Sequence, residues 1–146
     1  MIRPAHAGDA GAVEQLVREA YAVYAPRIGK QPGPVHDDYK ALIANGSVYI
    51  LDDGGIAGVA VLIPEADALL LDNVAVAPQR QGRGYGRMLI AFAEERARTF
   101  GLRAVRLYTN EAMIENVALY SQLGYVETRR GEENGFRRVY MVKRLE

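Results

Sequence analysis

The stretch VAVAPQRQGRGYGRML, from Val74 to Leu89, places three glycines within five positions. A β-like run precedes these glycines, and a helical pattern of apolar residues follows them. Glycines let a ligand approach the backbone closely, and the start of a helix presents free N–H groups and a positive dipole end. Arg80, Arg83 and Arg87 add local positive charge. The segment therefore predicts a diphosphate site. A tight strand-to-helix connection without a ligand is the structural alternative.

Two common nucleotide-binding loops do not fit this segment. A P-loop requires Gly-x-x-x-x-Gly-Lys-Ser/Thr, and no lysine or hydroxyl residue stands at the required place. A dinucleotide-binding fingerprint requires Gly-x-Gly-x-x-Gly on the first strand–helix turn, whereas the glycines here alternate as Gly-x-Gly-x-Gly. The part of the chain after the loop is also too short for the second half of a dinucleotide-binding fold.

Composition narrows the chemistry further. The 146 residues carry no formal net charge, so bulk electrostatic binding to nucleic acid is not expected. There is no cysteine, which excludes disulfides, thiolate metal sites and cysteine nucleophiles, and two histidines do not favour a metal centre. We find neither a signal-peptide pattern nor a stretch of transmembrane length, so we expect a cytoplasmic globular protein with no membrane partner.

Apolar periodicity and turn residues predict the order of the elements. Asp9 is expected to cap the first helix, and Pro26 is expected to end it. The predicted segments are a strand over 1–5, a helix over 9–24, a loop over 26–39, a short helix over 37–44, strands over 47–51, 56–63 and 68–76, a helix over 84–100, a strand over 103–109, a helix over 113–123, and strands over 125–130 and 136–145.

This order, β-α-α-β-β-β-α-β-α-β-β, predicts one α+β domain over residues 1–146. The first half forms an antiparallel meander, and the second half supplies strand–helix–strand crossovers. We therefore expect a central mixed sheet, mostly antiparallel, with helices on both faces.

Two segments resemble one known family. VAVAPQRQGRGYG is similar to the acetyl-coenzyme A motif of the GNAT superfamily of N-acetyltransferases. Gln81, Gly84 and Gly86 match its Gln/Arg-x-x-Gly-x-Gly/Ala positions, and Val76 and Pro78 match the preceding strand end. Downstream, NVALYSQLGYVE is similar to the family's Asn-x-x-Ala-x-x-x-Tyr-x-x-x-Gly-Phe/Tyr block. The two motifs occur together at the usual separation.

The resemblance implies an acetyl-CoA-dependent N-acetyltransferase. Such an enzyme passes the acetyl group directly to a primary amine of a small molecule, peptide or protein in a ternary complex, which agrees with a chain that lacks cysteine. No metal is expected. The alternative is a non-catalytic acyl-CoA-binding sensor or interaction module with the same fold. Transfer of a longer acyl chain remains open, and the resemblance also makes a homodimer one expected arrangement.

The resemblance also implies which residues hold the donor. The diphosphate is expected on the backbone of residues 81–86, and the strand at Val74 is expected to pair with the pantetheine arm. In the family, a bulge separates this strand from its parallel neighbour and opens a slot for the thioester. The backbone N–H of Val74 is the expected oxyanion donor. The expected donor-binding residues are Val74, Ala75, Val76, Gln81, Gly82, Arg83, Gly84, Tyr85, Gly86, Arg87, Asn110, Asn116 and Tyr120.

Acid and base roles follow from the same resemblance. Asn116 and Tyr120 are four residues apart and share a helix face. Tyr120 is expected to protonate the leaving thiolate, although core packing would explain the same residue. Asp72 is the first candidate for the base, with Glu111 or an ordered water chain as alternatives. The expected acceptor-binding residues are Tyr24, Arg27, Asp72, Asn73 and Glu111.

Overall fold

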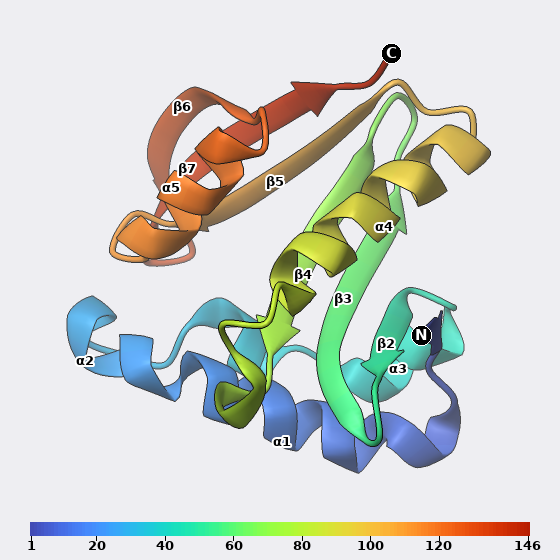
Figure 1. Cartoon of the computed structure of the whole chain (residues 1–146). Coiled ribbons are helices and arrows are strands. Elements are labelled where there is room, and N and C mark those ends of the chain that lie inside the picture. Colours follow the sequence, from blue (N-terminus) through green and yellow to red (C-terminus); the bar gives the residue numbers. More distant parts are fainter.

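The backbone forms one seven-stranded sheet with helices on both of its faces (Figure 1). A computed structural model describes all residues from 1 to 146. The strands are β1 Ile2–Pro4, β2 Val48–Asp52, β3 Ile56–Pro64, β4 Leu69–Val76, β5 Ala104–Asn110, β6 Val126–Glu133 and β7 Phe136–Arg144. The α-helices are α1 Ala10–Tyr21, α2 Ala25–Ile28, α3 Tyr39–Ala44, α4 Tyr85–Thr99 and α5 Ile114–Gln122. Short 3-10 turns occupy Ala7–Asp9, Ala22–Tyr24, Gly33–His36 and Pro78–Arg80.

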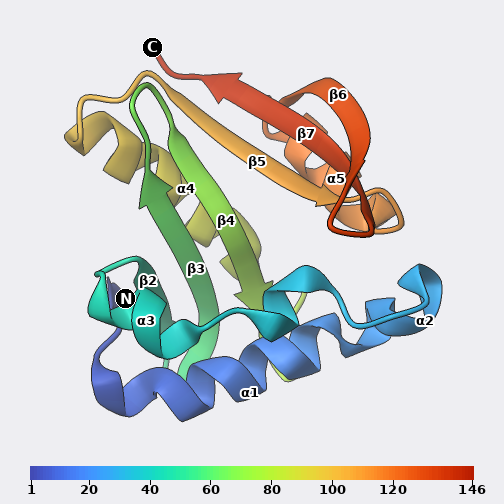
Figure 2. The same ribbon diagram turned by 180° about the vertical axis from the view of Figure 1, so that it is seen from behind.

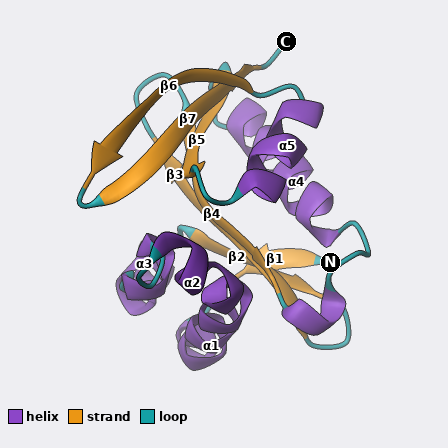
Figure 3. Ribbon diagram, turned by 90° about the vertical axis from the view of Figure 1, so that its left-hand side faces the viewer, coloured by secondary structure: helices purple, strands orange, loops and turns teal.

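The order of strands across the sheet is β1-β2-β3-β4-β5-β7-β6. Every neighbouring pair is antiparallel except β4 and β5, which are parallel. This arrangement confirms the predicted α+β class and the mixed, mostly antiparallel sheet. Helices α1, α2 and α3 lie on one side of the sheet and α4 and α5 on the other (Figures 2 and 3).

Two apolar cores fill the space between the sheet and its helices. One core packs α4 against the sheet through fully buried residues such as Leu89 and Ala93. The other core packs α1 through Val13 and Val17 against the opposite face of β2 and β3. Because both faces of the central strands are covered, their side chains are apolar on both sides, as in the buried run of β3.

The first helix ends earlier than its sequence pattern suggests. Helix α1 stops at Tyr21, and the chain continues through a 3-10 turn into α2. Pro26 lies in the first turn of α2 instead of ending the predicted helix over 9–24. A proline is accommodated there because the N–H groups of a first helical turn have no intrahelical partner. Gly29, with φ of 87°, ends α2.

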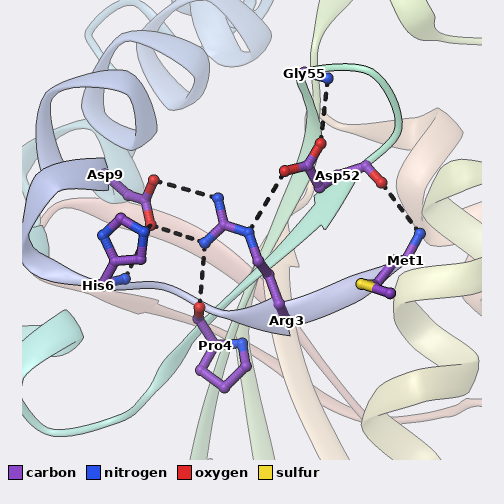
Figure 4. A network of polar contacts seen from close by, with 7 residues as sticks. All are labelled: Met1, Arg3, Pro4, His6, Asp9, Asp52 and Gly55. Atoms are coloured by element: carbon purple, nitrogen blue, oxygen red, sulfur yellow. Dashed lines mark hydrogen bonds and ion pairs between the residues drawn. The ribbon is translucent and has the colours of Figure 1, made fainter.

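A polar network at the N-terminus corrects the expected role of Asp9 (Figure 4). The Asp9 carboxylate accepts from the backbone N–H of His6 at 2.9 Å and from the Arg3 guanidinium at 3.0 Å. Asp9 occupies the N-cap position of α1, as predicted, but its side chain makes no capping bond to that helix. Arg3 also approaches the carboxylate of Asp52 at 3.5 Å, so one guanidinium joins β1, the start of α1 and the end of β2.

The sheet opens between its two parallel strands. Strands β4 and β5 pair only at Leu69 with Val105 and at Leu70 with Arg106, and then diverge (Figure 1). The register of β3 against β4 shifts at the same level, because Leu62 faces Leu71 while Val61 faces Asn73. Asp72 is thus the extra residue of a β-bulge, which bends β4 away from β5.

No helix in the structure has both the length and the apolar composition that crossing a lipid bilayer requires.

Candidate active site

Two hollows meet where β4 and β5 separate. The first, here called the β4 groove, is lined by Val74–Val76, by Gln81 and Gly86 at the two ends of the glycine loop (residues 81–86), and by the facing sides of α1, α4 and α5. The second, here called the β5 pocket, is lined by Asp72, the end of β5, the start of β7 and the loop over 32–34. The two hollows share four residues: Tyr21, Val74, Asn116 and Tyr120.

The backbone edge of β4 faces this opening. Ala77 donates its N–H to the carbonyl of Ala57 at 2.9 Å, which fixes the alternation of hydrogen bonds between β3 and β4. In that alternation, the N–H and C=O groups of Val74 and Val76 point away from β3. Side chains cover their carbonyls, since the Tyr21 hydroxyl lies 3.2 Å from Val74 O and Gln81 donates its amide to Val76 O at 3.3 Å. The two N–H groups are directed into the gap that β5 has left.

The glycine loop lies at the end of the β4 groove. Gly82 and Gly84 both have φ of 81°, a left-handed conformation that favours glycine, and Gly84 leads directly into α4. The first N–H groups of α4 therefore open toward the loop and can hold an anion. Arg83 lies in the same exposed loop. This arrangement can hold a diphosphate, and the main chain supplies most of the donors.

Two other residues of this segment have structural partners. Tyr85 is buried against the α4 core and donates its hydroxyl to the carboxylate of Asp53. Arg87 bonds the side-chain oxygen of Gln122 on α5 at 3.1 Å, which ties the first turn of α4 to α5. The Tyr85 side chain thus points into the protein, so only its backbone is available to a ligand in the loop.

Tyr120 lies at the junction of the two hollows. Its side chain is 9% exposed, and its ring packs edge-on against Tyr125 with centroids 5.8 Å apart. No protein group hydrogen-bonds its hydroxyl. Burial raises the pKa of Tyr120 to about 12, so the phenol is protonated at neutral pH and can donate a proton. Asn116 lies one turn earlier on α5 and also faces both hollows.

Asp72 projects into the β5 pocket from the bulge of β4. Its carboxylate accepts a hydrogen bond from the Tyr108 hydroxyl at 3.0 Å. Burial raises the pKa of Asp72 above its ordinary value, although the hydrogen bond from Tyr108 and the positive charge of Arg138 act in the opposite direction. A carboxylate with a raised pKa is suited to accept a proton near neutral pH.

Asn73 belongs to a buried network on the other side of β4. Its side-chain oxygen accepts from the Tyr21 hydroxyl at 2.5 Å, and its amide donates to the Tyr39 hydroxyl at 3.0 Å. Tyr39 in turn donates to the carbonyl of Pro34 at 2.7 Å. These bonds fix β4 relative to α1, α3 and the loop that covers the β5 pocket. They also occupy both ends of the Asn73 amide.

Several expected site residues lie at the edge of these hollows or outside them. Asn110 lines the β5 pocket instead of the β4 groove, and its side-chain oxygen accepts from Ala112 N at 2.9 Å. Glu111 lies in neither hollow and pairs with Arg137 at 2.5 Å. Tyr24 lines the β4 groove.

An ion pair joins α2 to the start of α5. Arg27 binds the carboxylate of Glu115 at 2.7 Å, and the Tyr24 hydroxyl lies 3.4 Å from the same carboxylate. Arg27 lines neither hollow. This contact holds α2 beside the mouth of the β4 groove.

Two residues of the β5 pocket were not identified from the sequence. Tyr108 and Arg138 come from β5 and β7, and the Arg138 guanidinium lies 4.1 Å above the Tyr108 ring. The only signal for them is alternation along the two strands, where buried Leu107 and Val139 alternate with partly exposed Tyr108 and Arg138.

Comparisons with known proteins agree with this geometry. The model of the acetyltransferase (GNAT) family matches residues 12–125. The ribosomal-protein-S18-alanine N-acetyltransferase of Escherichia coli superposes with a TM-score of 0.77 at 20% identity, over 99% of this chain and 93% of that one. The PaiA N-acetyltransferase of Thermoplasma acidophilum, solved in complex with coenzyme A, gives 0.79 at 17% identity, over 99% and 98% of the two chains.

A curated relative shares more sequence over a shorter length. The mycothiol acetyltransferase of Tsukamurella paurometabola is 38% identical over 85 residues, which are 58% of this chain. The match spans 26% of that relative's length. Since the family model covers most of the chain, including both motifs up to Tyr125, the chain belongs to the acetyltransferase (GNAT) family.

Proposed function

We propose that this protein transfers an acetyl group from acetyl-CoA to a primary amine of a small molecule or peptide. The observation that carries the proposal is the meeting of the β4 groove and the β5 pocket at Tyr120. A donor in the groove and an acceptor in the pocket would bring thioester and amine together at that point. Such a meeting favours direct transfer in a ternary complex, because it holds both reactants in one orientation.

The β4 groove has the features that coenzyme A requires. The diphosphate would bind the glycine loop and the start of α4, where backbone N–H groups are free. The pantetheine arm would lie along β4 and pair with the N–H group of Val76, in place of the missing part of β5, which leaves the N–H of Val74 for the thioester carbonyl. Asn116 would contact the same arm from α5.

The residues at the junction account for each proton in the reaction. The amine nitrogen would attack the thioester carbonyl carbon, and the N–H of Val74 would stabilise the developing oxyanion. Asp72 would take the proton that the amine loses. When the carbon–sulfur bond breaks, Tyr120 would protonate the departing thiolate and yield coenzyme A and the N-acetyl product.

Thermal unfolding with acetyl-CoA, followed by an amine screen for thiol release, tests this proposal. At a ligand concentration about a hundred times Kd, binding adds about 2.7 kcal/mol to the free energy of unfolding. We expect stabilisation by acetyl-CoA and none by ATP or NAD⁺, followed by amine-dependent release of the free thiol. Stabilisation without transfer to any amine would favour the acyl-CoA-binding module. An unchanged melting temperature with acetyl-CoA would contradict both functions.

A further inference from the structure

The β5 pocket holds two charges of opposite sign that do not neutralise each other. Asp72 forms no ion pair, and Arg138 pairs with Glu133 at 2.8 Å and with no other carboxylate. Both side chains line the same pocket and contact Tyr108: Asp72 accepts from its hydroxyl, and Arg138 stacks over its ring. The pocket is therefore dipolar, with a negative end beside the bulge of β4 and a positive end at the start of β7.

The positive end has hydrogen-bond donors to spare. The Arg138 side chain is 13% exposed, so its guanidinium is largely withdrawn from water. Glu133 bonds Nη1, whereas Nη2 and Nε have no protein acceptor. Neither atom is completely enclosed by protein, so both remain accessible and can donate to an anion in the pocket.

A second donor lies next to Arg138. Asn110 on β5 is the cross-strand partner of Arg138 on β7, and both residues line the β5 pocket. The side-chain oxygen of Asn110 is used by Ala112 N, which leaves its NH₂ group for another partner. A guanidinium edge and an amide NH₂ on neighbouring strands suit the two oxygens of a carboxylate.

The negative end lies closer to the reaction centre. Asp72 is two residues before Val74, whose N–H faces the gap, and Tyr120 lines the same pocket. An ammonium group held at Asp72 would therefore be next to the proposed acetyl donor. A carboxylate at Arg138 would lie at the far end of the same molecule.

We infer that the acceptor is an amino-acid-like zwitterion, whose amine binds at Asp72 and whose carboxylate binds Arg138 and Asn110. This inference rests on the proposed function. A diamine of similar length would place a second positive charge against Arg138. A protein N-terminus would present an uncharged peptide group to the same guanidinium.

The test compares two sets of acceptors that differ only in charge. The twenty L-amino acids and their carboxamides are each assayed for acetyl transfer by thiol release. We expect at least one amino acid to be acetylated with kcat/KM at least tenfold above that of its carboxamide. Amidation lowers the pKa of the α-amine and so favours the amide chemically. A preference for the acid therefore requires recognition of the carboxylate.

Variants locate that recognition. In Arg138→Gln, we expect KM for the amino acid to rise at least tenfold relative to KM for its carboxamide, so that the preference for the acid is lost, while KM for acetyl-CoA stays within about twofold. Arg138→Lys keeps the charge and should retain part of the preference. The matched control is Arg137→Gln, because Arg137 is 72% exposed and pairs with Glu111 outside the pocket.

Each outcome decides between defined alternatives. Equal or better use of carboxamides, diamines or peptide N-termini by the unaltered protein would overturn the zwitterion inference and leave the acetyltransferase proposal intact. If Arg138→Gln still prefers amino acids to their carboxamides, the assignment of carboxylate binding to Arg138 would be wrong. Acetyl transfer only to amines outside the two sets would overturn the zwitterion inference alone, whereas transfer to no amine in either set or in the wider amine screen would contradict the proposed function itself.

Discussion

The β4 groove and the β5 pocket share four residues but differ in the polar groups that they offer a ligand. The groove offers mainly main-chain groups, from the edge of β4, the glycine loop and the first turn of α4. The pocket offers side chains from six separate segments, among them Asp72, Tyr108 and Arg138. Main-chain donors are the same whatever the side chain, whereas a pocket of side chains changes with each substitution.

This difference separates donor binding, which members of the family can share, from acceptor recognition, which can differ between members. A groove of backbone amides can bind the same donor in chains that are only about one-fifth identical. A pocket of side chains can change its acceptor while the fold stays constant. Substitutions of side chains should therefore affect catalysis and acceptor use most, and substitutions that alter the backbone should affect the donor. The following predictions test that division, from the largest expected effect to the smallest.

We expect Asp72→Asn to lower kcat/KM for the amine about a hundredfold, as for loss of a general base. Because burial raises the pKa of Asp72, kcat of the unaltered protein should fall as the pH drops through that raised value, and the variant should lack this limb. Steady-state kinetics from pH 5 to pH 9 measure both effects. The same change at Glu111 distinguishes the two candidate carboxylates, since a larger loss there would assign the base to Glu111.

We expect Tyr120→Phe to lower kcat at least tenfold, which corresponds to about 1.4 kcal/mol in the transition state. The KM for acetyl-CoA should change little, because the ring remains in place. Tyr125→Phe is the matched control, since Tyr125 packs against Tyr120 but bonds Glu94 at 3.1 Å and lines neither hollow. An unchanged kcat in Tyr120→Phe would remove the hydroxyl from the mechanism.

We expect Gly84→Ala to raise KM for acetyl-CoA about fivefold, because a side chain at φ of 81° strains the loop by about 1 kcal/mol. Gly101→Ala imposes a similar strain at φ of 75°, and neither added Cβ would meet an atom within 4 Å. Gly101 lies at the other end of α4, so its variant should lose stability without a change in KM. Equal KM values in both variants would show that the loop conformation does not hold the donor.

The smallest effect concerns the acidity around the β5 pocket. Desolvation and the negative charge of Asp72 raise the pKa of Asp37 from 3.8 to about 6. The folded protein therefore binds this proton more tightly than the unfolded chain, and ionisation of Asp37 lowers stability as the pH rises from about 4 to above 6. Packing desolvates the Asp37 carboxylate only in part, because the residue as a whole remains exposed, and solvent screening should therefore keep the effect below about 1 kcal/mol.

Asp37→Asn should accordingly raise the melting temperature at pH 7.5 and leave it unchanged near pH 4. Thermal unfolding at the two pH values measures the difference between variant and unaltered protein. An equal difference at both values would mean that the Asp37 charge is not responsible.

The sequence predicted the groove more fully than the pocket because the groove is local in the chain. The glycine loop and the helix it begins lie within one continuous segment, and the spacing of Asn116 and Tyr120 places both on one helix face. Strand alternation also correctly separated Asp72 from Asn73. The order of elements followed from apolar periodicity, and the helix ends differed where Pro26 and Asp9 took other roles.

The pocket could not be predicted because its residues meet only in the folded sheet. Arg138 faces Tyr108 because β7 inserts between β5 and β6, and Tyr108 meets Asp72 across the opened sheet. The bulge at Asp72 and the divergence of β4 from β5 decide which polar residue faces which. The local pattern of a single strand shows neither feature, and it was the family resemblance that implied both the bulge and the separation of the two strands.

The short ladder between β4 and β5 gives the sheet the geometry of a hinge. Two pairs of residues at Leu69 and Leu70 join the strands, and the Arg106–Glu65 ion pair lies at the same end. Because the two strands diverge from this point, a small rotation of β5 relative to β4 at the paired end would produce a larger change in the distance between the strands near Val74. Packing around Leu70 therefore influences the width of the gap near Val74, where we propose that the acyl group lies. In the proposed function, residues that never touch the acyl group would thus help to limit the length of the acyl chain that fits.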